Sequence, residues 1–251
     1  MKAPYVRQFA LALVLAAWSL AWAGEDVQPI PALKAEVQTA EWAQSWWMPR
    51  HKEKLAALKS QQPIDLIMIG DSITHGWEGG GRKVWDQYYA KRHALNLGFG
   101  GDRTEQVIWR LQNGAVEGIS PKLAVVMIGT NNAGHRQDKP EDTAAGVQAI
   151  VDQLLKRLPK TKILLLAIFP RGRDANDPLR KLNDATNQIL AGYADKEHVF
   201  YLDLNAEFLK EDGVLPESIM PDLLHPNENG YEIWAKAMEP MVRKLMGEEG
   251  K

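Results

Sequence analysis

Apolar residues along this chain gather into short runs that alternate with longer segments of helical periodicity. The short runs, rich in aliphatic and β-branched side chains, predict buried strands at 64–69, 94–98, 123–128, 163–168 and 199–202. Amphipathic helices are predicted over 41–59, where Pro49 should break or restart the helix, and over 85–91, 104–111, 141–158, 179–194 and 229–246. Strands that alternate with helices indicate an α/β fold. We therefore predict a three-layer α/β/α sandwich around a five-stranded, flavodoxin-like parallel sheet.

Small polar clusters follow the first three of these strands. Gly70-Asp71-Ser72 ends the first, Gly100-Gly101-Asp102 the second and Gly129-Thr130-Asn131 the third. The carboxyl ends of parallel strands lie at one edge of a sheet, where ligands of open α/β folds bind. A loop before the last predicted helix adds Asp222 and His225. The pattern predicts one polar site at this edge.

These residues supply the groups that acyl transfer requires: a hydroxyl, a base, an orienting carboxylate and hydrogen-bond donors. The Ser72 hydroxyl needs a base before it can act as a nucleophile, and His225 is the candidate base. Asp222 would hold the far nitrogen of that imidazole and stabilise its protonated form. The oxyanion needs donors aimed in advance, and the candidates are the N–H of Ser72, the N–H of Gly101 and the side-chain amide of Asn131.

Each motif also has a purely structural interpretation. Gly-Asp-Ser can form a turn and a helix cap, Asp222-x-x-His225 a helix entry, and Asn131-Asn132 a capped turn. Their occurrence together, in this order, favours a catalytic site. His75 is the rival base, although a base one helical turn after its nucleophile rarely faces it. His135 follows the Asn131 loop and is a candidate for the pocket wall.

The first residues have the pattern of an export signal. Lys2 and Arg7 precede an apolar stretch from Phe9 to Leu20, and Ala21-Trp22-Ala23 is a small-x-small cleavage site. We predict a signal peptide at 1–23, a proline-containing linker at 24–40 and a single domain at 41–251. The mature protein is then expected to be periplasmic or secreted, with no stable membrane span.

Composition narrows the chemistry further. Removal of residues 1–23 takes away two of the 30 basic residues and none of the 32 acidic ones, which leaves a formal charge of −4. This mild acidity disfavours nucleic acid as a partner. The chain has no cysteine, which excludes a disulfide and a thiolate nucleophile. We expect no cofactor and no metal, since the chain contains neither a P-loop nor a His-Glu-x-x-His motif.

Tryptophan is abundant, with nine residues. Trp42, Trp46 and Trp47 fall in the first predicted helix and have two interpretations. They can pack that helix against the sheet, or they can stack on sugar rings.

Four sequence blocks give the chain a resemblance to the SGNH hydrolases, the GDSL-type esterase/lipase superfamily. The blocks are Gly70-Asp71-Ser72-Ile73, Gly98-Phe99-Gly100-Gly101-Asp102, Gly129-Thr130-Asn131-Asn132 and Asp222-Leu223-Leu224-His225-Pro226. Within that superfamily, the run Ala94–Thr104, followed by Trp109–Gly114 and Phe169–Gly172, is similar to the catalytic subunits of platelet-activating factor acetylhydrolase. The first block has Ile73 where the family name places leucine, and the third ends in Asn132 rather than aspartate.

The resemblance implies a Ser72–His225–Asp222 triad and an oxyanion hole that Gly101 and Asn131 complete. It implies a metal-independent serine esterase that removes short acyl groups, acetyl above all, through an acyl-enzyme. It also implies a homodimer as an assembly to test. Carbohydrate deacetylation is one candidate activity. The alternatives are a lysophospholipase or thioesterase of longer acyl preference, a non-catalytic carbohydrate-binding relative, and a flavodoxin-like cofactor binder.

Overall fold

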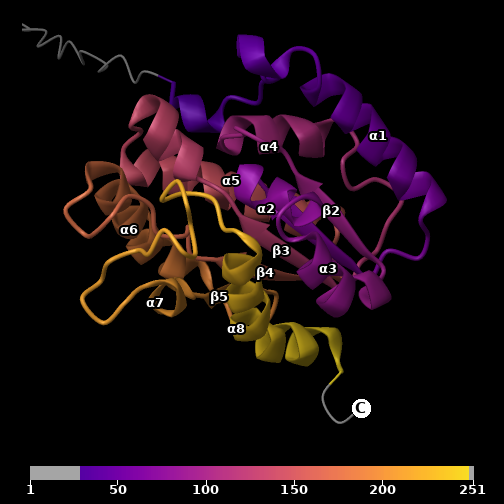
Figure 1. Cartoon of the computed structure of the whole chain (residues 1–251). Coiled ribbons are helices and arrows are strands. Elements are labelled where there is room, and N and C mark those ends of the chain that lie inside the picture. The colour runs from indigo at the N-terminus through magenta and orange to yellow at the C-terminus, as the bar shows by residue number, and fades with distance from the viewer. Residues whose placement is uncertain (1–28, 249–251) are drawn as a thin grey trace, which may run out of the picture.

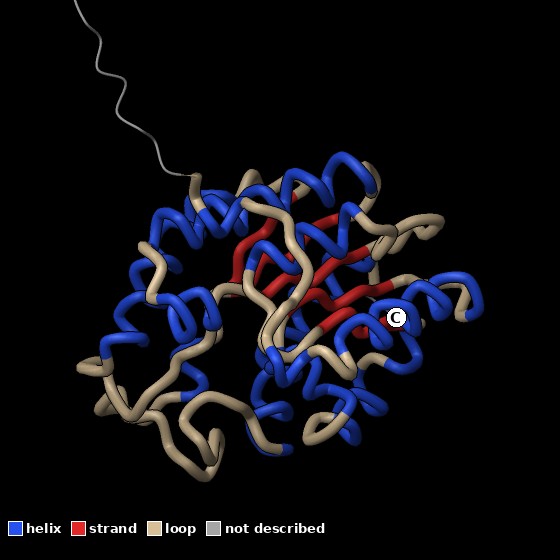
Figure 2. The backbone as a smooth tube through the Cα atoms, turned by 90° about the horizontal axis from the view of Figure 1, so that it is seen from above, coloured by secondary structure: helices blue, strands red, loops and turns tan. Residues whose placement is uncertain are grey.

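A computed structural model describes residues 29–248 of the chain. Five parallel strands form one sheet in the order β2-β1-β3-β4-β5, which is the flavodoxin-like order. The strands are β1 (Leu66–Gly70), β2 (Ala94–Gly98), β3 (Leu123–Met127), β4 (Lys162–Leu166) and β5 (Val199–Leu202). Helices lie on both sides of the sheet (Figures 1 and 2). The predicted fold class and strand order are confirmed.

The main helices close to the predicted positions are α1 (Trp47–Ser60), α3 (Arg82–Tyr88), α4 (Thr104–Gln112), α5 (Pro140–Arg157), α6 (Pro178–Leu190) and α8 (Glu228–Met246). Shorter elements join them: α2 (Ser72–His75), α7 (Asn205–Phe208), the π-helical turn η5 (Asn132–Arg136), and 3-10 turns at 31–33, 41–43, 76–78, 90–92 and 191–193.

The first predicted helix is interrupted, but not at Pro49. A 3-10 turn, η2, covers Glu41–Ala43, and α1 begins at Trp47. Pro49 therefore lies in the first turn of α1. The N–H groups of a first turn have no carbonyl partner within the helix, so a proline there removes no helical hydrogen bond. The break comes before the proline instead of at it.

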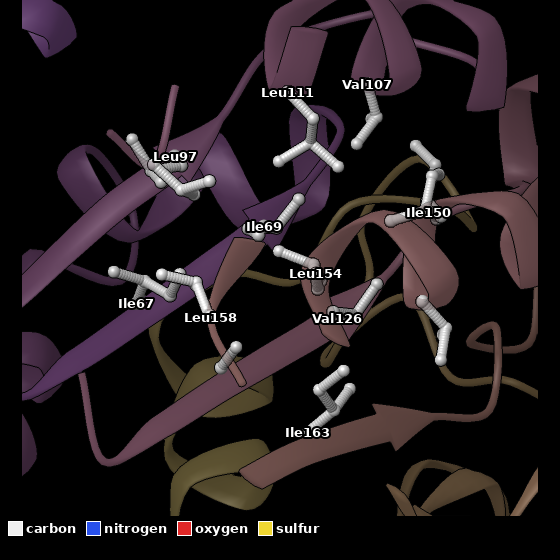
Figure 3. Packing of buried hydrophobic residues seen from close by; sticks show 14 of the residues in the cluster. Ile67, Ile69, Leu97, Val107, Leu111, Val126, Ile150, Leu154, Leu158 and Ile163 are labelled. Carbon is white, nitrogen blue, oxygen red and sulfur yellow. The ribbon is translucent and has the colours of Figure 1, made fainter. Parts of the chain in front are cut away.

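Alternate residues of each strand face opposite sides of the sheet. Ile67 and Ile69 of β1 pack with apolar side chains of α1, α4 and α5, the cluster shown in Figure 3. Leu66 and Met68 pack on the other side with α2, α3 and α8. Both sets are almost fully buried, as expected for a parallel sheet covered on both faces.

The predicted signal peptide, 1–23, and the beginning of the predicted linker lie outside the described residues. The remainder of that linker includes η1 (Pro31–Leu33), whose Ala32 is fully buried. The Ala32 carbonyl accepts a hydrogen bond from Thr104 Oγ1 at the start of α4, with 2.9 Å between the oxygens. Within residues 29–248, no helix is both long and apolar enough to cross a membrane.

Candidate active site

The ends of β1, β2 and β3 lie level with one another. Gly70 is in register with Gly98 of β2 and with Met127 of β3. The loops that carry Ser72, Gly101 and Asn131 consequently start from the same edge of the sheet, as the sequence predicts.

Ser72 is the first residue of α2, directly after the turn from β1. Asp71 caps this helix, because its Oδ1 accepts the Ile73 N–H at 3.0 Å. The turn is tight: a Cβ on Gly70 would lie 2.2 Å from Thr74 Oγ1 and 2.4 Å from the Met127 carbonyl oxygen. Only glycine fits there, and the sharp turn brings the half-buried Ser72 to the sheet edge.

A chain of hydrogen bonds joins Ser72 to the loop before α8. His225 Nε2 lies 2.9 Å from Ser72 Oγ, and His225 Nδ1 lies 2.6 Å from Asp222 Oδ2. The other carboxylate oxygen, Oδ1, accepts the backbone N–H groups of His225 at 2.7 Å and Leu224 at 3.1 Å. Asp222 therefore fixes both the ring and the backbone of His225. A proton on Nδ1, facing the carboxylate, leaves Nε2 to accept the serine proton.

The surroundings of Asp222 favour its charged form. Partial burial acts to raise the pKa of this carboxyl group, but hydrogen bonds from the His225 side chain and backbone outweigh it and lower the pKa. Its side chain is 55% exposed. Asp222 is thus an ionised, solvated carboxylate at neutral pH, which is the state needed to stabilise an imidazolium.

The two loops predicted to form the oxyanion hole are tied together. Gly101 has a φ of +71°, a conformation that glycine adopts readily. The next residue, Asp102, accepts a hydrogen bond on its carbonyl oxygen from Asn131 Nδ2 at 3.0 Å. Asn131 is buried, with 6% of its surface exposed. Its amide is therefore held in place by the loop that carries Gly101.

A buried network lies beneath the Gly101 loop. Asp102 Oδ2 accepts from Arg110 Nε at 2.9 Å, and Oδ1 accepts from Trp47 Nε1 at 2.6 Å. Arg110 Nη1 also donates to the Leu97 carbonyl at 3.0 Å, and its guanidinium lies 4.1 Å from the centre of the Phe99 ring. These contacts connect the loop to α1 and α4.

The sequence reasoning did not assign this network. An arginine on the otherwise apolar face that Val107, Ile108 and Leu111 form on α4 is the one signal that could have pointed to it.

His75 does not take the position of the base. Its Nδ1 accepts the Gly100 N–H at 3.3 Å, while His225 contacts Ser72. Burial lowers the pKa of His75 to about 4, and the positive charge of Arg50 adds to this effect. His75 is therefore neutral at neutral pH and carries its proton on Nε2. His135 lies exposed on η5.

Asp71, next to Ser72, is a second carboxyl group whose pKa is shifted, in the opposite direction to that of Asp222. It is fully buried, and burial raises its pKa to about 7, although its hydrogen bond with the Ile73 N–H and the nearby His225 oppose the shift. No group of three or more His, Asp or Glu side chains within 29–248 is arranged to hold a metal ion.

A pocket of about 540 Å³ lies between β5 and α8, and none of Ser72, Asp222 and His225 lines it.

Comparison with known proteins places this chain in a family. The GDSL-like lipase/acylhydrolase family model matches residues 68–233, a range that contains all five predicted site residues. The chain is 35% identical over 207 residues to human platelet-activating factor acetylhydrolase IB subunit alpha1, covering 81% of this chain and 85% of that protein. It is 36% identical over 203 residues to the alpha2 subunit of Rattus norvegicus, covering 80% and 86%.

Solved structures agree on the fold. A GDSL-like lipase from Bacteroides thetaiotaomicron matches with a TM-score of 0.64 at 18% identity, covering 78% of this chain and 97% of that one. The acetylxylan esterase Axe2 from Geobacillus stearothermophilus matches with a TM-score of 0.58 at 20% identity, covering 74% and 94%. With the family match and the relatives above, the chain belongs to the GDSL-like lipase/acylhydrolase family and is a carboxylic ester hydrolase.

Proposed function

We propose that this protein is a serine esterase that hydrolyses short-chain acyl esters, acetyl esters above all, through a covalent acyl-enzyme. The observation that carries the proposal is the continuous hydrogen-bond chain from Asp222 through His225 to Ser72, at 2.6 and 2.9 Å. Membership of the family and its acetylhydrolase relatives support the same reaction class.

The reaction follows from the roles of these groups. His225 Nε2 takes the proton of the Ser72 hydroxyl as Oγ attacks the ester carbonyl carbon. The carbonyl oxygen becomes an oxyanion and accepts hydrogen bonds from the N–H groups of Ser72 and Gly101 and from the Asn131 amide. The tetrahedral intermediate then collapses, and His225 returns the proton to the leaving alcohol. Water, activated by His225, hydrolyses the acyl-enzyme and restores Ser72.

Substitution of the nucleophile tests the proposal. Residues 24–251 and their Ser72→Ala variant are compared on p-nitrophenyl acetate with a chelator present, and on p-nitrophenyl esters of two to eight acyl carbons. We expect the chelator to have no effect on turnover and acetate to be the best substrate. The Ser72→Ala variant should show no turnover, while its circular dichroism spectrum matches that of the native protein. Undiminished turnover in the Ser72→Ala variant would show that another group carries the chemistry, and a preference for eight carbons would favour the lysophospholipase or thioesterase alternative.

We further propose that the protein is exported and acts outside the cytoplasm. The pattern of residues 1–23 supports this: a basic start, an apolar stretch and a small-x-small cleavage site. Expression of the full chain in a bacterial host, followed by N-terminal sequencing of the mature protein, tests it. Export predicts a new N-terminus at Gly24, whereas retention of Met1 on a cytoplasmic protein would contradict it.

A further inference from the structure

Trp42 is the most exposed large apolar side chain in the described part of the chain, with 52% of its surface accessible. An isolated exposed apolar residue is ordinary on a protein surface. The location of Trp42 is not ordinary, because its ring lies against Gly101. A Cβ added to Gly101 would fall 2.0 Å from Cη2 of the indole. The exposed ring therefore adjoins the loop that carries a predicted oxyanion donor.

Two more rings extend this surface to α2, the short helix that begins at Ser72 and ends at His75. Trp46 stacks on Trp42, with 6.3 Å between ring centres and 26° between planes, and the ring centres of Trp46 and His75 are 5.8 Å apart. A Cβ added to Gly100 would lie 3.4 Å from Cη2 of Trp46. The three side chains form a continuous aromatic surface, which we call the aromatic wall, along the Gly100-Gly101 loop.

The aromatic wall is held in a fixed position. Trp46 Nε1 donates to the Trp42 carbonyl at 3.0 Å. Ala43, which lies between them in the sequence, is fully buried, and Trp47 is 98% buried and hydrogen-bonded to Asp102. A ring fixed in this way loses little conformational entropy when a ligand packs on it. Trp42 and Trp46 also precede residue 68, where the family match begins, so they belong to the part of the chain outside that match.

We propose that the aromatic wall binds the alcohol half of the substrate, and that this half is a pyranose ring, which makes the preferred substrates O-acetylated carbohydrates. This inference rests on the proposed esterase function. A pyranose presents axial C–H groups to an aromatic face and hydroxyl groups to water. Such a ligand suits an apolar ring that stays half exposed beside a reaction centre.

The polar groups of the aromatic wall fit the same ligand. His75 is neutral, its Nδ1 is occupied by the Gly100 N–H, and its Nε2–H has no partner among residues 29–248. That N–H is a donor for a hydroxyl or acetyl oxygen on the sugar. An acyl chain would gain most from a closed apolar channel, because its burial from water supplies the binding free energy. A half-exposed ring with a neighbouring donor offers less to such a chain.

The test compares two acetyl esters, glucose pentaacetate, which contains a pyranose, and glycerol triacetate, which does not. The variants are Trp42→Leu, which keeps an apolar side chain without a ring, and Trp42→Phe, which keeps a ring. Leu33→Ala is the control, since Leu33 is the other exposed large apolar residue, at 41%. We expect the ratio of kcat/KM between the sugar ester and the glycerol ester to fall about tenfold in Trp42→Leu. The loss should come mainly through KM, with a smaller change in Trp42→Phe and none in Leu33→Ala.

Three results would overturn the inference. An unchanged ratio in Trp42→Leu would show that the ring does not contact the sugar. An equal loss on both esters would show that Trp42 acts by shaping the Gly101 loop. A selective loss on p-nitrophenyl octanoate relative to acetate would assign the aromatic wall to the acyl chain.

A binding measurement separates this inference from the proposed function. Ser72→Ala protein is titrated with glucose pentaacetate by calorimetry, with and without Trp42→Leu in the same chain. Weaker binding without the ring supports the aromatic wall even if no ester is turned over, in which case only the esterase proposal fails. Equal binding with and without the ring, beside Ser72-dependent hydrolysis of glycerol triacetate, rejects only the aromatic wall.

Discussion

Replacement of Asp71 by asparagine should stabilise the protein, and by an amount that depends on pH. Asp71 is 1% exposed, and burial raises its pKa from 3.8 to about 7. Its Oδ1 accepts the Ile73 N–H that begins α2. Asparagine supplies the same acceptor oxygen and is an equally good N-cap. The variant thus keeps the cap and removes the group that is costly to ionise in the core.

The sign follows from proton binding. Between about pH 4 and pH 7 the folded protein keeps a proton on Asp71 that the unfolded chain has lost. Stability therefore falls as pH rises through this window and levels off above it. A difference of about three pH units corresponds to roughly 4 kcal/mol, at 1.36 kcal/mol per unit. Asp71→Asn should match the native stability near pH 4 and exceed it by roughly 4 kcal/mol at pH 8.

Urea unfolding at each pH unit from 4 to 8 measures this difference. Asp71→Ala is the control: it also removes the titration but loses the cap, so its curve should run parallel to that of Asp71→Asn and about 1 kcal/mol lower. The reasoning would be refuted if the difference in free energy of unfolding between the native protein and Asp71→Asn stayed constant from pH 4 to pH 8. It would mean that water or a partner keeps the carboxylate ionised in the folded state.

Two other changes test the two loops predicted to form the oxyanion hole. Asn131→Ala should lower kcat on p-nitrophenyl acetate by roughly 10²–10³-fold with little change in KM, the usual effect of one lost oxyanion donor; a rise in KM alone would make Asn131 a substrate contact. Arg110→Met should lower the free energy of unfolding by about 3–5 kcal/mol, because it leaves the Asp102 carboxylate buried without its partner. Adding Asp102→Asn to that variant should restore part of the loss in urea unfolding, whereas strictly additive effects of the two changes would contradict the pairing.

The fold was predictable because each strand carries its own signal. A parallel strand covered on both faces is apolar at nearly every position, and the run Leu66–Ile69 has no polar residue. The helix boundaries were harder to predict, as α1 shows. Pro49 disrupts a helix interior but is tolerated in a first turn, and which of these applies depends on where packing starts the helix. Burial of Trp47 against Phe99 sets that start, and neighbouring residues do not encode it.

For the site, too, local sequence signals predicted some features, whereas others depend on packing between distant parts of the chain. Ser72, Gly101 and Asn131 each follow a strand, so strand prediction alone was enough to bring their loops to one edge. The partner of Ser72 was a choice between His75 and His225. Local spacing disfavoured His75, and in the structure it is His225 that contacts Ser72. What spacing could not supply was the position of His75 against Gly100, which depends on how Trp46 packs from outside the sheet.

The carboxylates at this edge show why burial, and not residue type, decides their roles. Asp102 and Asp222 have the same side chain and lie in two loops that carry predicted site residues. Asp102 is fully buried, and burial raises its pKa to about 6 against the opposing effects of Arg110 and Trp47. Asp222 is more than half exposed, and its pKa is lowered. An exposed, hydrogen-bonded carboxylate stays ionised at neutral pH, which suits the role proposed for Asp222 beside an imidazolium. Asp102 is hydrogen-bonded to Trp47, which lies 55 positions earlier in the chain, so the difference between these two aspartates arises only once the chain has folded.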